Sequence, residues 1–129
     1  MNNDRFQKGL ETLNAIDGEA GQRVIDSLGN IAPDFARFLA ECFGDIYSRP
    51  ALSLKARETA VIAALAALGH AIPQLKVHLH AGLNVGLTPD EIREIIMMMS
   101  MYAGFPAALN AMFAAREVFM ERGVHCSPA

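Results

Sequence analysis

Residues 54–86 read LKARETAVIAALAALGHAIPQLKVHLHAGLNVG, and this stretch decides the fold. Its first half, residues 54–68, is apolar on every face from position 59 onward, which predicts a helix that is buried on all sides. Gly69 ends this helix, Pro73 opens a second one, and Gly86 closes the second. The sequence therefore places two consecutive helices at the centre of the domain.

The residues before this stretch also predict helices. Apolar side chains recur at helical spacing over residues 3–15 and again over residues 19–28, and Gly18 breaks the pattern between them. Pro33 suits the first turn of a further helix that ends near Gly44. A connector follows, in which a proline precludes continued helix and a serine can cap the helix after it.

Two more helices are predicted after the central stretch. Thr88 and Glu91 form the pattern of a capping box, which starts a helix over roughly residues 89–103. Pro106 opens a last helix that runs to about Arg122, and the tail beyond it is expected to be loose. No strand pattern is present, so the chain is predicted to be all-α.

Length and composition set the class of protein. A chain of 129 residues predicts a single domain over residues 1–129, with its core over about 5–122. Its hydrophobic content of 52%, rich in Ala, Leu, Ile and Met, favours assembly into a homo-oligomer. A net charge of −3 without a basic stripe argues against nucleic acid and against an anionic membrane surface. No signal core or membrane span is visible, which predicts a cytoplasmic protein.

The candidate chemistry centres on His78 and Glu58. Residues four apart share a helical face, so Gln74 lies on the same face as His78, whereas His80 points elsewhere. Chelation of a metal by both histidines is not expected, because helical zinc sites use a spacing of four. Glu58 is the single acid on an apolar helix, which places it at the mouth of a pocket or in a pair.

Each of these residues also has a structural interpretation. Glu58 could form an ion pair with Arg49 or Arg57 that pins the connector to the helix, a reading that the residues favour equally with a catalytic role. His78 could be a buried histidine bonded to a backbone carbonyl. The methionines of residues 97–101 are predicted to pack in the core or in an oligomer contact.

Four segments in this order and spacing resemble the carboxymuconolactone decarboxylase family. The resemblance covers about residues 5–122, and its segments are Gly44-Asp-Ile-Tyr-Ser-Arg-Pro50, Leu75-Lys-Val-His78 followed by Ala81 and Gly86, Thr88-Pro-Asp-Glu-Ile92, and Tyr102-Ala-Gly-Phe-Pro-Ala-Ala108. It implies an alkylhydroperoxidase D-like fold of about six or seven helices, assembled as a homo-oligomer, a hexamer or trimer. Members either reduce peroxides through a Cys-x-x-Cys-x-x-x-His motif or decarboxylate 4-carboxymuconolactone in aromatic catabolism.

The motif residues favour the decarboxylase branch. With His78 on the motif histidine, Ala71 and Gln74 stand where the two cysteines would be, so the dithiol chemistry is excluded in its usual form. Glu58 departs from the decarboxylase branch, which tends to carry a small residue after the arginine at position 57. The two cysteines of the chain, at positions 42 and 126, form no Cys-x-x-Cys pair.

The predicted function is cofactor-free decarboxylation of 4-carboxymuconolactone or a similar small lactone or carboxylic acid. His78 is the expected general acid/base, and Glu58 is expected to set its tautomer and raise its pKa. The expected substrate contacts are made by Arg49, Arg57, Gln74 and Tyr102. Two other hypotheses remain: a thiol-independent family member with another small substrate, and a non-catalytic oligomeric binding protein.

Overall fold

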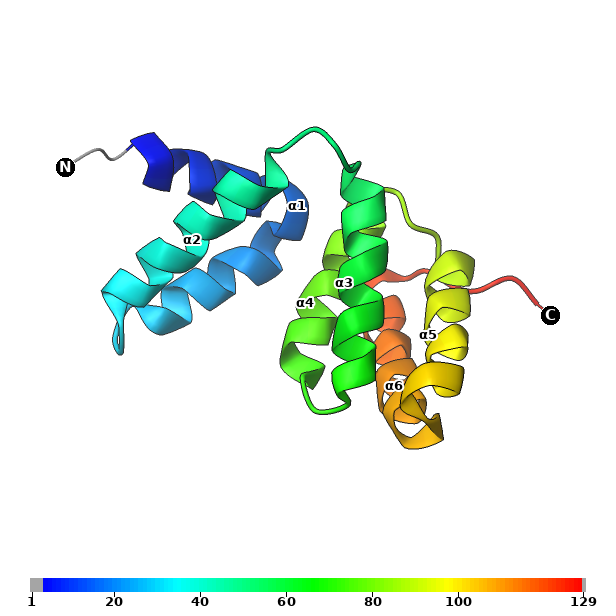
Figure 1. Ribbon diagram of the computed structural model, residues 1–129. Helices are drawn as coiled ribbons and strands as arrows, with labels where there is room; N and C mark the ends of the chain where they lie inside the picture. The colour runs from blue at the N-terminus through cyan, green and yellow to red at the C-terminus, as the bar shows by residue number, and fades with distance from the viewer. Residues whose placement is uncertain (1–3, 129) are drawn as a thin grey trace. The chain divides into compact units, whose positions relative to one another are not determined.

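The computed structural model describes residues 4–128, and this part of the chain contains six helices and no strand (Figure 1). The all-α prediction is confirmed. Contacts divide the chain into two compact units, with the boundary between Leu54 and Lys55. The N-terminal unit holds the first two helices and the C-terminal unit the rest; the helices are α1 (Asp4–Leu28), α2 (Pro33–Tyr47), α3 (Leu54–Leu68), α4 (Ile72–Asn84), α5 (Pro89–Ala103) and α6 (Phe105–Arg122).

The N-terminal unit is a pair of packed helices with a kink in the first. Gly18 interrupts α1 with φ of 61° and ψ of −143°, which confirms the break expected there. The two helices approach closely where Gly9 of α1 meets Gly44 of α2, because neither residue has a side chain. A Cβ atom on Gly44 would lie 2.7 Å from the Cα atom of Gly9. This contact fixes how α2 lies on α1.

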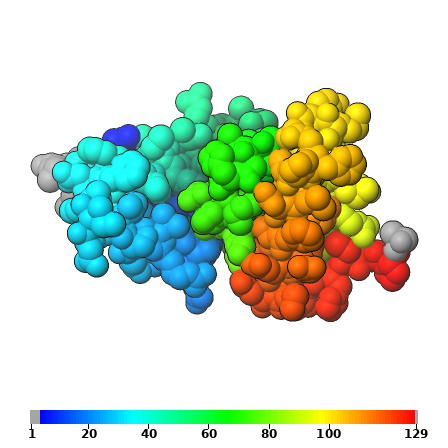
Figure 2. All heavy atoms as spheres, turned by 90° about the horizontal axis from the view of Figure 1, so that it is seen from below, coloured from blue at the N-terminus to red at the C-terminus, as the bar shows by residue number. Residues whose placement is uncertain are grey.

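The core of the C-terminal unit takes side chains from all four of its helices. Its fully buried members are spaced at helical intervals on each element, as expected for amphipathic packing; the largest are Ile62, Leu75, Leu79, Ile92, Ile96 and Val118. In Figure 2 the orange atoms of α6 lie between the green atoms, which belong to α3 and α4, and the yellow atoms of α5. Helix α6 packs against both of these neighbours.

The prediction that α3 is buried on all sides is wrong for the described chain. Helix α3 has the predicted bounds, but only Glu58, Ile62 and Ala66 are buried on it, and Leu68 is 56% exposed. An alanine-rich apolar run gives no information on how many other helices cover it, and here only a narrow stripe of α3 is buried. Of the methionines, Met99 packs against the core, whereas Met97 and Met101 are 52% and 76% exposed, so for these two the oligomer contact stays a prediction.

The start of α5 is as predicted, whereas the tail is not. Thr88 and Glu91 form the reciprocal capping box, with both hydrogen bonds present. The tail was expected to be loose, but the backbone N–H of Ser127 donates to Asp90 Oδ1 at 2.7 Å. The Arg93 guanidinium also donates to the Ser127 carbonyl at 3.3 Å. These bonds hold the tail against the first turn of α5.

A helix must be both long and apolar to cross a lipid bilayer. Among residues 4–128, no helix combines the length and the apolar character required to cross a bilayer.

Glu91 contributes to stability in a way that depends on pH. The Thr88 backbone N–H and the Lys55 ammonium, 3.4 Å away, hold the pKa of this carboxyl below its ordinary range. A lowered folded-state pKa stabilises the protein above the unfolded pKa, and the stabilisation is lost as the pH falls through the folded pKa. Glu91→Gln should therefore lower the free energy of unfolding near pH 7, and its difference from wild type should shrink toward zero as the pH falls through the lowered folded-state pKa of Glu91.

Urea unfolding followed by circular dichroism at several pH values measures this difference. Glu94→Gln on the exposed face of the same helix is the matched control, because Glu94 forms no ion pair with any residue of the described chain. A Glu91→Gln difference that stays constant across the acid range would contradict the charge-based explanation.

Candidate active site

The loop between α3 and α4 turns the chain back on itself and makes the two helices neighbours. Only residues 69–71 separate them, and Gly69 adopts a φ of 79° that favours glycine. A Cβ atom on Gly82 would lie 3.0 Å from the Ile62 side chain, so α4 approaches α3 closely. Ile62 lies one turn beyond Glu58, and Gly82 lies one turn beyond His78. Glu58 and His78 thus each lie within one turn of this close contact between the two helices.

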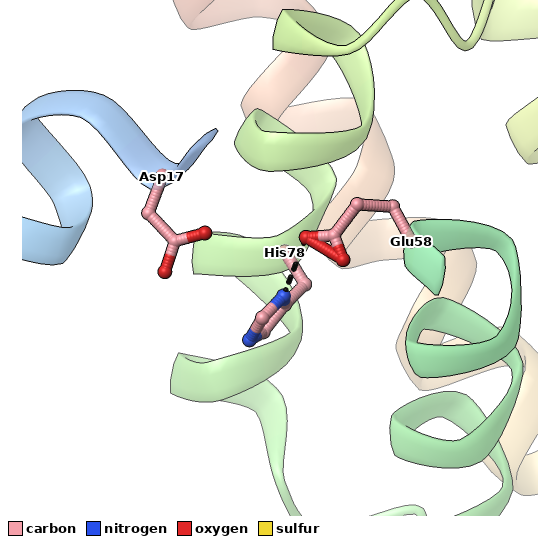
Figure 3. A group of neighbouring side chains, drawn as sticks. All are labelled: Asp17, Glu58 and His78. Atoms are coloured by element: carbon pink, nitrogen blue, oxygen red, sulfur yellow. Dashed lines mark hydrogen bonds and ion pairs between the residues drawn. The ribbon is translucent and has the colours of Figure 1, made fainter. Parts of the chain in front are cut away.

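Glu58 and His78 are joined by a direct hydrogen bond. Oε1 of Glu58 lies 2.9 Å from Nδ1 of His78, and Figure 3 shows the two side chains pointing toward each other from α3 and α4. Asp17, also drawn in Figure 3, belongs to the N-terminal unit. The Glu58 side chain is fully buried, whereas that of His78 remains 18% exposed. The acid thus stands behind a histidine that keeps a path to solvent.

This bond assigns the roles of the two ring nitrogens. An ionised carboxylate only accepts hydrogen bonds, so Nδ1 of His78 donates to Glu58. Nε2 is then the ring atom that can exchange a proton with a bound molecule. The arrangement is suited to general acid/base chemistry.

His80 lies on another face of α4, as its spacing predicted. Its Nε2 lies 3.1 Å from Glu121 and its Nδ1 lies 3.2 Å from the Arg122 guanidinium, both on α6. Asn84, one turn further, accepts from Arg122 at 2.8 Å, and Lys76 pairs with Glu117 of α6. This row of contacts joins α4 to α6. His80 therefore serves packing between helices, and it is separate from the Glu58–His78 pair.

The other residues expected to contact substrate occupy different places. Arg57 is half-buried on α3 beside Glu58, and Gln74 is exposed on α4 one turn before His78. Tyr102 is 75% exposed near the end of α5. Arg49 is exposed in the connector of the N-terminal unit. Arg57 and Gln74 thus lie on the two helices that carry the Glu58–His78 pair. The roles of all four residues stay predictions.

Sequence reasoning missed a hollow elsewhere in the C-terminal unit. It lies between α5, α6 and the tail, and two of its lining residues are Arg93 and Arg116. These arginines are on different helices, and the tail that forms one wall was expected to be loose. The only signal in the sequence is the Gly123 that follows α6, whose left-handed φ of 65° redirects the chain.

Comparison with known proteins identifies the family of this chain. The model of the carboxymuconolactone decarboxylase family matches residues 33–117, a range that includes both Glu58 and His78. The chain belongs to this family. It is 39% identical over 127 residues to 4-carboxymuconolactone decarboxylase of Acinetobacter baylyi, covering 96% of this chain and 94% of that protein. The family resemblance inferred from the four motifs is confirmed.

The chain is also similar to two proteins whose names state no activity. An uncharacterized 15.0 kDa protein of Paracoccus denitrificans is 32% identical over 118 residues, covering 90% of this chain and 88% of that protein. Peroxisomal protein 2 of Saccharomyces cerevisiae is 27% identical over 104 residues, covering 77% of this chain and 36% of that protein. Membership of the carboxymuconolactone decarboxylase family therefore leaves the substrate to be argued from the site.

Proposed function

We propose that this protein is a carboxy-lyase that decarboxylates 4-carboxymuconolactone or a closely similar small lactone acid, without a cofactor. The observation that carries the proposal is the hydrogen bond between buried Glu58 and partly exposed His78. The similarity to the Acinetobacter decarboxylase, which spans nearly the whole of both chains, supports it. The family's thiol peroxidase chemistry is a poorer fit, because Ala71 and Gln74 occupy its cysteine positions.

The proposed reaction needs one proton and a place for one electron pair. The bond between the carboxylate carbon and the lactone ring breaks, and carbon dioxide leaves. Its electron pair enters the unsaturated lactone, which serves as its own electron sink. His78, protonated on both nitrogens, then gives the proton of Nε2 to a ring carbon of the resulting dienolate, which forms the enol-lactone. Glu58 holds the remaining proton on Nδ1, and solvent restores the proton on Nε2.

Substrate orientation supplies the rest of the proposed catalysis. A lactone acid of this kind carries carboxylates, and an arginine can hold a carboxylate through two parallel hydrogen bonds. Arg57 is the first candidate, because it precedes Glu58 on the same helix. Gln74 lies on the same face of α4 as His78 and can contact the lactone. Arg49 and Tyr102 remain further candidates for the substrate contacts.

We also propose that the protein works as a homo-oligomer. Large apolar side chains are exposed on both units, including Phe35 at 57%, Phe38 at 56% and Phe105 at 71%. Contiguous exposed apolar surface is unusual on a monomer and favours association. Light scattering on the protein sample used in the assay measures the mass of the assembly, which should be a multiple of the 13.9 kDa chain.

The deciding experiment is an ultraviolet assay of the purified protein with enzymatically generated 4-carboxymuconolactone. We expect catalytic release of one carbon dioxide for each lactone consumed, with the enol-lactone as product. Heat-denatured protein at the same concentration is the control for spontaneous decarboxylation. A folded protein without turnover would contradict this substrate, and the search would pass to other small acids that the Glu58–His78 pair could serve.

A further inference from the structure

We infer that the hollow between α5, α6 and the tail is a second ligand site, which binds a small monoanionic acid with an apolar body. The hollow encloses about 510 Å³, within the range of roughly 300–1,000 Å³ that is usual for small-molecule pockets. All of its lining lies in the C-terminal unit, between Arg93 and Cys126. This inference does not depend on the proposed decarboxylation.

The lining combines an apolar surface with positive charge. Met112, Ala115 and Phe119 of α6 supply apolar surface, and Met120 and Val124 extend it. The charged lining residues are Arg93 and Arg116, and no aspartate or glutamate lines the hollow. In a protein whose net charge is −3, this is a local concentration of positive charge in a lining that contains no acid. Such a surface complements an anion that carries an apolar group.

The two arginines differ in how far their charge is already matched. Arg93 lies 3.5 Å from the Asp90 carboxylate and donates to the Ser127 carbonyl. Arg116 is exposed, and its guanidinium lies over the Phe113 ring at 5.1 Å from the centroid. Among residues 4–128, no carboxylate lies within salt-bridge distance of the Arg116 guanidinium. Arg116 is therefore the cation that would bind the anionic head.

The tail makes one wall of the site. The left-handed Gly123 ends α6, and the Val124 N–H donates to the Phe119 carbonyl at 3.0 Å. The bond from Ser127 to Asp90 then holds the chain across to α5. Fixed at both ends, this segment places Val124, His125 and Cys126 along the hollow. The wall is thus ordered before any ligand binds, which lowers the entropic cost of binding.

Two other hollows in the described part of the chain lack this charge. One is formed by apolar side chains of α2 together with Cys42 and Tyr47, and another lies between α5 and α6 around Phe105 and Leu109. Neither is lined by a charged side chain. An apolar acid should therefore prefer the arginine-lined hollow to the other two.

Methionine methyl signals can test the site directly. Met120 lines this hollow and Met97 lines the one around Phe105, so ¹³C-methyl methionine labelling reports on the two separately. The probe is 4-phenylbutyrate, and its uncharged counterpart is 4-phenylbutanol. We expect 4-phenylbutyrate to shift the Met120 signal saturably without a matching shift at Met97. The alcohol should bind about tenfold more weakly, because it lacks the charge-assisted hydrogen bond.

Two matched variants complete the experiment. Arg116→Gln should weaken 4-phenylbutyrate binding about tenfold while leaving the alcohol unchanged. Arg23→Gln, at an exposed arginine of α1 in the other unit, should change neither affinity. Equal affinities for acid and alcohol, equal affinities in wild type and Arg116→Gln, or no saturable shift at Met120 would each overturn the inference.

Discussion

Replacing His78 with alanine is expected to lower kcat/KM for the lactone by about 10²–10⁴-fold, the range usually lost with a general acid or base. The reason is that Nε2 is the atom positioned to deliver the proton, while Nδ1 is engaged with Glu58. Nothing else in the pair can replace this proton transfer, because the Glu58 side chain is fully buried behind the ring. The steady-state ultraviolet assay measures the loss.

Removal of the ring also takes a hydrogen bond from a buried carboxylate, so a second variant separates chemistry from folding. His78→Asn keeps an N–H donor near the position of Nδ1 but has no titratable group, and it should be folded and inactive. His80→Gln is the matched control, because His80 lies on the same helix and contacts α6 instead. Wild-type turnover in His78→Asn, or an equal loss in His80→Gln, would contradict the assigned role.

Gly9→Ala is expected to lower the free energy of unfolding by about 1–3 kcal/mol or more, the cost of overpacking. Intrinsic helix propensity predicts the opposite sign, because alanine stabilises a helix interior by about 1 kcal/mol relative to glycine. A Cβ atom at Gly9 would collide with the carbonyl oxygen of Ala40 and lie 3.1 Å from the backbone N of Glu41. Backbone atoms of a helix cannot move aside singly, so α1 and α2 must separate.

Gly44→Ala should have the same effect from the other side of the contact, whereas Gly29→Ala, at an exposed turn, is the control. The measurement is urea unfolding in a Tyr102→Phe background, which leaves Tyr47 as the single tyrosine. Tyr47 stacks on Phe43 at a centroid distance of 4.0 Å, so its near-ultraviolet signal reports on the N-terminal unit. A stability of Gly9→Ala equal to or above wild type would show that the close contact does not hold this unit together.

Most helix boundaries were predictable because local chemistry sets them, but the predicted end of α2 near Gly44 is wrong, because this helix runs on to Tyr47. Pro33, the Thr88 capping box and Gly104 act through their own backbone geometry, and the structure begins or ends helices at these signals. The burial of α3 was not predictable in this way. Its alanine-rich sequence is compatible with one covered face or with several, and only the arrangement of the neighbouring helices decides.

The candidate site was predictable in part. Glu58 stood out because a single carboxylate in an apolar helix needs a compensating partner, and helical spacing separated His78 from His80. The partner itself was left open between arginine and histidine, since periodicity gives the faces of two helices but no register between them. The bond to His78 became visible only with the packing of α3 against α4.

The kink at Gly18 has a consequence for how this gene can vary. Its φ of 61° and ψ of −143° lie in a region that is open essentially to glycine alone. Every missense change at this codon adds a Cβ atom, so each one requires the chain to abandon the bend or bear its strain. Exposed neighbouring positions, such as Glu19, can accept many different amino acids. Position 18, in contrast, can change only if the path of the α1 backbone changes with it.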